Sequence, residues 1–351
     1  MTNITLCRTS DLPALQEFLH HNWAPNHILA RSMDLMAFQH GSATPDGSYN
    51  WLIAKDNNEI LGILGFIPTT KYDQSLTEQM TWLALWKVRS DRPNTGLGLK
   101  LLSHLMRMVG DDPIGVLGIN PNHPPIYRAL RFDVDELKQY FVTNHSLSQG
   151  LIQSSPGRSL PTPKPGNAEF KLLTLDTLHE TVLDPVADFR HAPLKTPLYL
   201  ANRYLHHPIY LYHLYQINLD GKTKGILVTR VARYQEHKAL RIVDFVGDPS
   251  IFSSLGTAVQ AALEFHQCEY ADLWQYGLNE SHLSMSGFEL VPSDNSVIVP
   301  SYFEPFAAKN VRIQFAVKNV AKDILLIFRG DGDQDRPNVP PGQKIELPPK
   351  D

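Results

Sequence analysis

Residues 85–100 read LWKVRSDRPNTGLGLK. The apolar beginning of this segment predicts the end of a strand, and Gly96 and Gly98 lead directly into a helical pattern. Glycine removes the Cβ atoms where a ligand has to approach the backbone. The first turn of the helix also presents unpaired N–H groups and the positive end of the helix dipole. The segment therefore predicts an α/β fold with an anion site, suited to a pyrophosphate, at the start of the helix.

This glycine pattern differs from two common phosphate-binding motifs. No Gly-Lys-Ser/Thr follows at the spacing of a P-loop, and Leu101 stands where the dinucleotide fingerprint requires a third glycine. Taken alone, a Gly-x-Gly turn is as compatible with a plain structural turn as with a ligand site.

Apolar periodicity predicts the other elements of the first half. Helices are predicted over 12–22, 32–38, 96–108 and 124–130, and strands over 51–55, 59–67, 80–88, 114–119 and 139–143. The second half repeats this plan, with a hairpin over 210–231, strands over 240–246 and 270–276, and a helix over 252–265. Landmarks recur at a nearly constant offset, which favours duplication of one α/β unit: Gly62 with Gly225, Val88 with Val246, and Phe132 with Phe288. Two unrelated α/β domains of similar layout are the alternative.

Composition suggests where these units begin and end. Residues 144–166 are rich in Ser, Pro and Gly, which is typical of a linker, and residues 331–351 form an acidic, Pro-rich tail. We therefore predict mixed α/β domains over 1–143 and 167–330, joined by that linker and followed by that tail.

The composition also excludes some function classes. The chain has 351 residues, 42% of them hydrophobic and 19% charged, which is typical of a globular protein of two domains. The net charge of −4 and the lack of a Lys/Arg block argue against nucleic acid as a partner. Cys7 and Cys268 form no CxxC pair, so we expect no metal site. No signal peptide or long apolar run is recognisable, so we expect a cytoplasmic protein that does not associate with membranes.

With two downstream motifs, the segment resembles the GNAT superfamily of N-acetyltransferases. The family's CoA motif places an Arg/Gln-x-x-Gly-x-Gly/Ala loop a few residues after a strand that ends near a valine, here Val88. Both glycines and the spacing match, but Pro93 stands where the family has Arg or Gln. Downstream, Asn120 ends the next strand as in the family. Tyr127-Arg128-Ala129-Leu130-Arg131-Phe132 matches the family's Tyr-x-x-x-Gly-Phe except at Arg131.

The resemblance implies that acyl-CoA is the co-substrate. It places the CoA pyrophosphate on the backbone of Asn94, Thr95, Gly96, Leu97, Gly98 and Leu99. It places the pantetheine arm along the strand edge of Trp86, Lys87 and Val88, with a hydrogen bond from Asn120. Tyr127 would donate a proton to the departing CoA thiolate, a role that suits a phenol. An ordinary half-buried helix tyrosine is the alternative for Tyr127.

The residue that removes a proton from the attacking amine is less evident. No carboxylate lies on the strand before the loop, over 81–86. Asp244, within an apolar strand, is one candidate because a buried carboxylate needs a cationic partner, such as a substrate ammonium. Pairing with a structural arginine such as Arg230 or Arg241 is the alternative. His206 and His207 are further candidates, although a histidine at the end of a helix is more often a surface residue.

The second half lacks the counterpart of the CoA motif. Asp248 and Pro249 stand where the first half has its glycine loop, and Leu283 stands where it has Tyr127. A carboxylate repels a pyrophosphate and proline has no N–H, so we interpret this half as a degenerate copy. We expect it to form the acceptor pocket, since clefts between domains are common ligand sites.

The whole chain resembles bacterial two-domain sugar N-acyltransferases of this superfamily. The matching stretches are residues 27–31, 203–208 and 331–338. The resemblance implies an acceptor that is a nucleotide-linked amino sugar, such as a dTDP-3-amino-3,6-dideoxyhexose, in the synthesis of surface polysaccharide such as the O-antigen of lipopolysaccharide. The acyl group, acetyl or longer, is left open. Alternatives are another small amine or cell-wall precursor as acceptor, and a non-catalytic acyl-CoA sensor.

Overall fold

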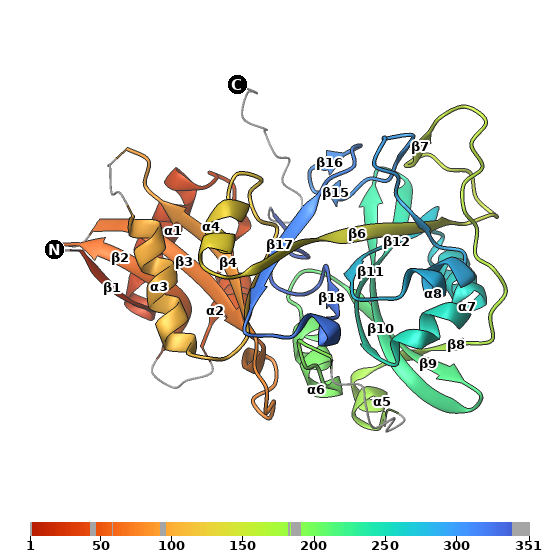
Figure 1. Cartoon of the computed structure of the whole chain (residues 1–351), viewed down its shortest axis with the longest axis horizontal. Coiled ribbons are helices and arrows are strands. Elements are labelled where there is room, and N and C mark those ends of the chain that lie inside the picture. Colours follow the sequence, from red (N-terminus) through yellow and green to blue (C-terminus); the bar gives the residue numbers. More distant parts are fainter. Residues whose placement is uncertain are drawn as a thin grey trace.

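A single mixed sheet runs through both halves of the chain (Figure 1). The computed structural model describes residues 2–42, 47–57, 59–91, 96–181, 183 and 191–338. Within them the sheet has 14 strands, in the order β1-β2-β3-β4-β5-β17-β6-β12-β11-β10-β9-β8, with β13 and β18 pairing beside this path. The predicted mixed α/β class is confirmed.

The elements of the first half lie close to their predicted positions. Its helices are α1 (Leu12–Asn22), α2 (Met33–His40), α3 (Leu97–Val109) and α4 (Pro124–Ala129). Its strands are β1 (Asn3–Arg8), β2 (Ser48–Asp56), β3 (Glu59–Pro68), β4 (Thr81–Val88), β5 (Ile114–Leu117) and β6 (Asp133–Thr143). The strand β1 was not predicted, and β6 begins six residues before the predicted strand at 139–143.

Buried side chains point alternately to the two sides of the strands, so this part of the sheet has two apolar faces. In β2, Trp51 and Ile53 pack with α1 and α2, whereas Leu52 and Ala54 pack with α3 and α4. Successive side chains of a strand point to opposite faces, so a continuous apolar run is the expected sequence of a strand covered on both sides. The helix that follows the glycine loop therefore lies on the same face as the helix that carries Tyr127.

The second half has the same plan. Its main strands are β8 (Glu169–Leu173), β9 (Tyr212–Leu219), β10 (Lys222–Tyr234), β11 (His237–Gly247) and β12 (Tyr270–Tyr276). Its helices are α5 (Leu175–His179), α6 (Pro197–Leu200), α7 (Gly256–His266) and α8 (Glu280–Met285). Short strands follow or flank them: β7 (Gln153–Ser154), β13 (Glu289–Leu290), β14 (Val297–Ile298), β15 (Tyr302–Phe303), β16 (Phe306–Ala307), β17 (Ile313–Lys318) and β18 (Ile327–Phe328).

The strand directions repeat between the halves. In each half four strands pair antiparallel in succession, and the fourth pairs parallel with the fifth: β4 with β5, and β11 with β12. This repeat of order and direction supports the interpretation that one α/β unit has been duplicated. The predicted helix over 252–265 begins later, at Gly256, because residues Pro249–Ser254 form a 3-10 helix.

The two halves exchange strands at the centre of the sheet. The strand β17, from the second half, lies between β5 and β6 and pairs antiparallel with both. The strand β6 continues into the second half, where it pairs with β12 and β13 (Figure 1). Sheet pairing therefore crosses the boundary that composition placed at residue 143, because each half uses a strand of the other.

The segments expected to be linker and tail are packed against the second half. Leu151 and Ile152 are buried, and β7 pairs with β14. Asp331 and Asp333, within the expected tail, are also buried. The acidic composition was misleading here, because Lys195 binds Asp331, and Arg336, three residues along the same segment, lies 3.3 Å from Asp333. The rest of the tail, residues 339–351, lies outside the described residues.

Candidate functional site

The strands β4 and β5 pair over three positions and then diverge. Their register runs from Thr81 opposite Ile114 to Leu83 opposite Val116. Beyond that point β4 continues to Val88, and its neighbours among the described strands are β3 on one side and β5 on the other. The β5-facing edge of residues 84–88 is therefore without a partner strand in the described part of the chain. We call this the first divergence; Trp86, Lys87 and Val88 all lie along it.

The helix α3 begins beside the first divergence. Gly96 is its N-cap and has a φ of 83°, a left-handed conformation that favours glycine. The first helical hydrogen bond runs from the N–H of Lys100 to the carbonyl of Gly96. The N–H groups of Leu97, Gly98 and Leu99 have no partner among the described residues, and N–H groups at a helix start can bind an anion. Asn94 and Thr95 lie outside the described residues.

Glycine suits the two positions of the motif for different structural reasons. A Cβ added at Gly96 would meet no described atom within 4 Å, so this position faces open space. A Cβ added at Gly98 would lie 3.1 Å from the indole ring of Trp86. The prediction that both glycines make room for a ligand is thus incomplete, because Gly98 makes room for Trp86.

Tyr127 lies across the first divergence from α3. Its ring packs edge-on against Trp86 and Phe132, with centroids 6.5 and 5.4 Å apart. Burial raises the pKa of Tyr127 to about 12. A phenol with this pKa is protonated throughout the neutral range and can donate a proton. Its hydroxyl has no hydrogen-bond partner among the described residues.

Asn120 lies on the turn that leads from β5 into α4. Its side-chain oxygen accepts a hydrogen bond from the N–H of Asn122 at 3.0 Å, and its carbonyl accepts one from His123. These contacts shape the turn before Tyr127. The side chain is exposed, and its amide nitrogen has no partner in the described part of the chain.

The equivalent strands of the second half, β11 and β12, diverge in the same way but the space is filled. Their pairing ends at Ile242 opposite Leu273. Beyond it, β18 pairs with Gln275 and Tyr276 of β12, and the N–H of Gly330 donates to the carbonyl of Val243 on β11 at 2.7 Å. We call this the second divergence and residues 327–331 the strap. The chain itself therefore occupies the position that is open in the first half.

Asp244 is bound within the second divergence. It is fully buried and accepts hydrogen bonds from Lys195 Nζ at 2.5 Å, the hydroxyl of Tyr204 at 2.6 Å and the N–H of Phe245. Lys195 also binds Asp331 of the strap, at 3.0 Å. The alternative of a structural cation as partner of Asp244 therefore holds, but that cation is Lys195 and not Arg230 or Arg241, which bind Asp335 and Asp272. A carboxylate this enclosed is poorly placed to accept a proton from an acceptor amine.

The two histidines differ in exposure and in available nitrogen atoms. His206 is exposed, with Nδ1 3.2 Å from the side-chain oxygen of Asn202. His207 Nδ1 accepts hydrogen bonds from the N–H groups of Ile209 and Tyr210, at 3.1 and 2.8 Å. Burial lowers the pKa of His207 to about 4, so the ring is neutral and its lone-pair nitrogen is already used. His207 is therefore a poor general base.

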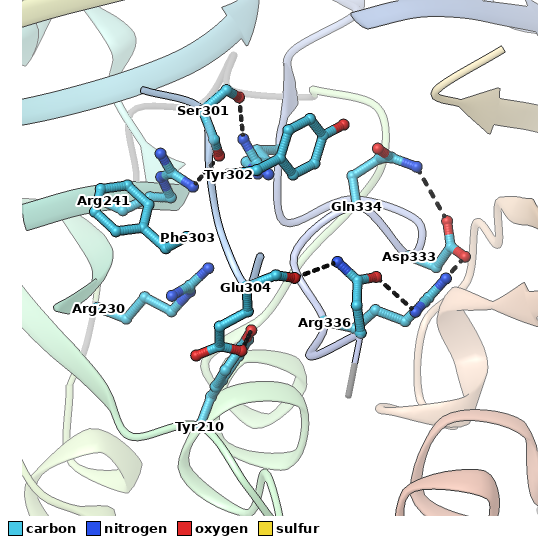
Figure 2. A pocket seen from close by; sticks show the side chains of 12 residues that line it. Tyr210, Arg230, Arg241, Ser301, Tyr302, Phe303, Glu304, Asp333, Gln334 and Arg336 are labelled. Atoms are coloured by element: carbon cyan, nitrogen blue, oxygen red, sulfur yellow. Dashed lines mark hydrogen bonds and ion pairs between the residues drawn. The ribbon is translucent and has the colours of Figure 1, made fainter. Parts of the chain in front are cut away.

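A pocket lies between the halves, where the chain continues beyond the strap (Figure 2). Its lining contains the following residues: Tyr210, Arg230, Arg241, Ser301, Tyr302, Phe303, Glu304, Arg329, Asp333, Gln334, Arg336 and Asn338. Gln334 connects it to the first half, since its side chain donates to the carbonyl of Leu117 at the end of β5, at 3.1 Å. A Cβ at Gly332 would lie 3.6 Å from Leu117 and 3.8 Å from Trp82. The pocket thus adjoins the point where β4 and β5 diverge.

Sequence reasoning missed most of this lining. Residues 331–336 were interpreted as a solvated tail, yet they bring Asp333, Gln334 and Arg336 to the pocket. Arginines at buried strand positions, such as Arg230 and Arg241, were a usable signal because such residues need carboxylates nearby. The run of aspartates at 331, 333 and 335 could have supplied those carboxylates.

In the ranges that the structure describes, no group of three or more His, Cys, Asp or Glu side chains is arranged to hold a metal ion. No helix in those ranges is both long and apolar enough to cross a membrane.

Comparison with known proteins adds information on the fold. No protein-family model and no curated protein matches the chain. One similar solved structure is a GCN5-related N-acetyltransferase from Anabaena variabilis ATCC 29413, with a TM-score of 0.54 and 14% identity over 92% of this chain and 73% of that one. Another is a conserved protein of unknown function from Enterococcus faecalis V583, described as a probable N-acyltransferase, with a TM-score of 0.51 and 8% identity over the same shares. The chain has the GNAT fold. At these identities the likeness concerns the fold, and the activity has to be argued from the site.

Proposed function

We propose that the chain is an acyl-CoA-dependent N-acyltransferase. The observation that carries this proposal is the first divergence. Among the described residues, its strand edge has no partner strand and the N–H groups of the adjacent helix start have no acceptor, and a buried tyrosine lies beside them. An extended pantetheine arm carries amides that pair with a strand edge, and a pyrophosphate matches the N-terminus of a helix. The second divergence has neither feature available, so the first half is the half that binds CoA.

The proposed binding mode uses backbone groups. The N–H groups of Leu97, Gly98 and Leu99 hold the pyrophosphate, and Asn94 and Thr95 belong to the same proposed loop. The edge of Trp86, Lys87 and Val88 pairs with pantetheine, and the free amide of Asn120 donates to a pantetheine carbonyl. Because Gly96 faces open space, its position tolerates close approach of the ligand.

The proposed reaction forms one bond and breaks another. The amine nitrogen of the acceptor attacks the thioester carbonyl, a C–N bond forms, and the C–S bond of acyl-CoA breaks. The CoA thiolate takes a proton from Tyr127, whose pKa of about 12 keeps the phenol protonated until that step. The attacking nitrogen loses a proton to an acceptor group, directly or through water.

Among the described side chains, we assign that proton acceptor to Asp333. It lies in the pocket lining beside Gln334, which contacts the end of β5. Arg336 Nε lies 3.3 Å from one Asp333 oxygen and the Gln334 amide 3.4 Å from the other. These contacts leave lone pairs of the carboxylate available, in contrast to Asp244, which is enclosed by three donors.

For the acceptor, we propose a nucleotide-linked amino sugar. The support is the resemblance of the whole chain to bacterial two-domain sugar N-acyltransferases, together with a pocket between the halves that is lined by arginines and aromatic rings. Arginine forks suit phosphoryl groups and aromatic rings can stack on a base or sugar. The same features suit other small amines that carry a negative charge.

Three measurements on the purified chain test the proposal. Titration with CoA should show saturable binding, and thiol release from acetyl-CoA or a 3-hydroxyacyl-CoA should require an amine. A panel of dTDP-amino sugars, other amino sugars and cell-wall precursors would identify the acceptor class. Tight CoA binding without thiol release for any amine would instead favour an acyl-CoA sensor, and a lack of CoA binding would contradict the proposal.

The proposed role of Asp333 as proton acceptor is tested by substitution. Asp333→Asn should lower kcat and leave the Kd for CoA unchanged.

A further inference from the structure

Three of the four arginines that line the pocket between the halves are matched with carboxylates. Arg230 binds Asp335 through Nε and Nη2, both at 2.8 Å. Arg241 binds Asp272 through Nε and Nη2, both at 3.1 Å, and also donates to the carbonyls of Pro300 and Ser301. The more exposed Arg336 has Asp333 at 3.3 Å. The charges of these three guanidinium groups are thus compensated within the protein.

Arg329 is different. Its side chain is only 3% exposed, but its nearest carboxylate oxygen is Asp335 Oδ1 at 3.8 Å, and Asp335 already accepts hydrogen bonds from Arg230. Nη1 donates to the neutral hydroxyl of Ser301 at 2.8 Å, and Nε is buried without a hydrogen-bond partner among the described residues. Burial lowers the pKa of Arg329 to about 10, which leaves the guanidinium charged at pH 7.

The strap positions this charge. The N–H of Arg329 donates to the carbonyl of Trp274 on β12, and its guanidinium carbon lies 5.3 Å from the ring centre of Tyr302. The pocket beside it measures about 120 Å³, enough for several water molecules or for one phosphoryl or carboxylate group. Figure 2 shows the lining side chains around this space, with Glu304 beside Tyr210. Glu304 is exposed and accepts a hydrogen bond from the Tyr210 hydroxyl at 3.0 Å.

A buried guanidinium whose nearest carboxylate lies 3.8 Å away and is shared with Arg230 is unfavourable unless a ligand supplies a further anion. We propose that Arg329 binds an oxyanion of the acceptor, a phosphoryl or carboxylate group, and that this contact selects acceptors with a negative charge. This deepens the proposed function and rests on it for the identity of the ligand as the acceptor. The contact lies in the same pocket as Asp333, so an acceptor held by its anionic group can present its amine toward the end of β5.

Binding measurements on the full chain test the site without relying on activity. Isothermal titration with dTDP, inorganic pyrophosphate, succinate and thymidine compares a nucleotide diphosphate, its anionic part, a dicarboxylate and an uncharged nucleoside. We expect saturable binding of dTDP and pyrophosphate and none of thymidine. Arg329→Gln should weaken dTDP binding at least tenfold. If succinate bound and the phosphorylated probes did not, the result would support the site with a carboxylate group as its ligand.

Two controls keep the result interpretable. Arg312→Gln removes an arginine that is paired with Glu136 on the surface, and it should leave dTDP binding unchanged. Should Arg329→Gln fail to fold, a wild-type crystal soaked with pyrophosphate should show the anion within hydrogen-bond distance of Arg329. Equal dTDP affinity of Arg329→Gln and wild type, an absence of anion binding, or a soaked crystal with no anion at Arg329 would overturn the proposal.

CoA titration of the same samples separates this inference from the proposed function. A wild-type protein that binds CoA but no anion would reject the role of Arg329 and leave the acyltransferase proposal standing. Anion binding without CoA binding would reject the acyltransferase and leave an anion site whose ligand is not an acyl acceptor.

Discussion

The first and second divergences are the same structural feature with opposite outcomes. In both, two parallel strands pair over a few positions and separate, and a helix follows the first strand of the pair. At β4 and β5, within the part of the chain that the structure describes, the strand edge has no partner strand and the first N–H groups of the helix have no acceptor. At β11 and β12 the strap inserts, and Gly330 bonds to the carbonyl of Val243.

The starts of α3 and α7, the helices that follow β4 and β11, differ in the same way. The start of α3 is a left-handed glycine with open space around it. At the start of α7, a Cβ on Gly256 would collide with the carbonyl of Lys164, because residues before β8 pass directly over it. The comparison teaches that strand order alone does not make a ligand site. What decides is whether the protein's own chain fills the strand edge and the helix start.

The largest expected effect of this difference is on catalysis. Tyr127→Phe should lower kcat by about 10²-fold or more, because the phenol is the proposed general acid. The Kd for CoA should stay within about twofold, since the ring and its contact with Trp86 remain. Because burial raises the pKa of Tyr127 to about 12, the wild-type rate should show no decline from this group below about pH 10.

Tyr215→Phe is the matched control in the second half. Its hydroxyl lies 2.7 Å from His266 Nε2, and burial also raises its pKa to about 12. This variant should keep the wild-type kcat. Similar losses for the two variants would mean that Tyr127 has only a structural role.

The next effect is on CoA affinity. Gly96→Val should raise the Kd for CoA by about 100-fold, or about 2.7 kcal/mol, because a β-branched residue resists a φ of 83° and would distort the helix start. Titration of wild type and variant with CoA measures this directly.

Gly110→Val places a strained residue at the other end of the same helix. Gly110 has a φ of 67° and a ψ of −128°, a region that L residues avoid more strongly than the left-handed helical one, and a Cβ there would meet no described atom within 4 Å. Gly96→Val should lose about 1–2 kcal/mol of stability from the left-handed conformation, and Gly110→Val should lose at least as much. Only Gly96→Val should lose CoA affinity; equal Kd changes would show that helix stability, rather than the helix start, determines binding.

Much of the first half could be predicted because its signals are local. The helical pattern after Gly98 and the apolar run before Val88 are each contained in one short stretch, and α3 and β4 lie where they were predicted. The position of β17 could not be predicted in this way. Its partners β5 and β6 lie far away in the sequence, and no local pattern specifies such a pairing.

The candidate site was only partly predictable for a related reason. Charged residues normally prefer water, so the aspartates after residue 330 indicated a solvated tail. Their burial depends on Lys195 and Arg230, whose proximity is created by the fold. Asp244 was recognised as a carboxylate in need of a cation, but Lys195 gave no signal in the sequence that would have identified it as the partner.

A smaller effect is expected from disturbing the filled divergence. In Gly330→Ala, the new Cβ would lie 2.6 Å from the carbonyl oxygen of Val243 and closer still to the hydroxyl of Tyr204. We expect a loss of about 1–3 kcal/mol in the free energy of unfolding, as for other overpacked sites, with the Kd for CoA within about twofold of wild type. Denaturant titration and CoA binding test the two parts. A variant of unchanged stability that binds CoA poorly would show that the strap controls the first divergence.

An effect of similar or smaller size concerns the electrostatic balance of the strap. Burial raises the pKa of Asp331 to about 6 from its ordinary 3.8, although Lys195 acts in the opposite direction. A carboxyl whose pKa is raised on folding stabilises the native state below pH 3.8, and this contribution is lost as the pH rises through 6.

Asp331→Asn removes the titration and keeps an oxygen that accepts a hydrogen bond from Lys195 or from the N–H of Phe328. The free energy of unfolding of the variant relative to wild type should therefore rise by about 1–3 kcal/mol between pH 4 and pH 8. Carboxyl groups far from Asp331 titrate equally in both proteins, so the difference between denaturant titrations at the two pH values reports on Asp331 together with Lys195 and Asp244, which interact with it. Parallel pH curves would mean that the carboxyl is ionised at both pH values, and that the strap fills the second divergence without this electrostatic cost.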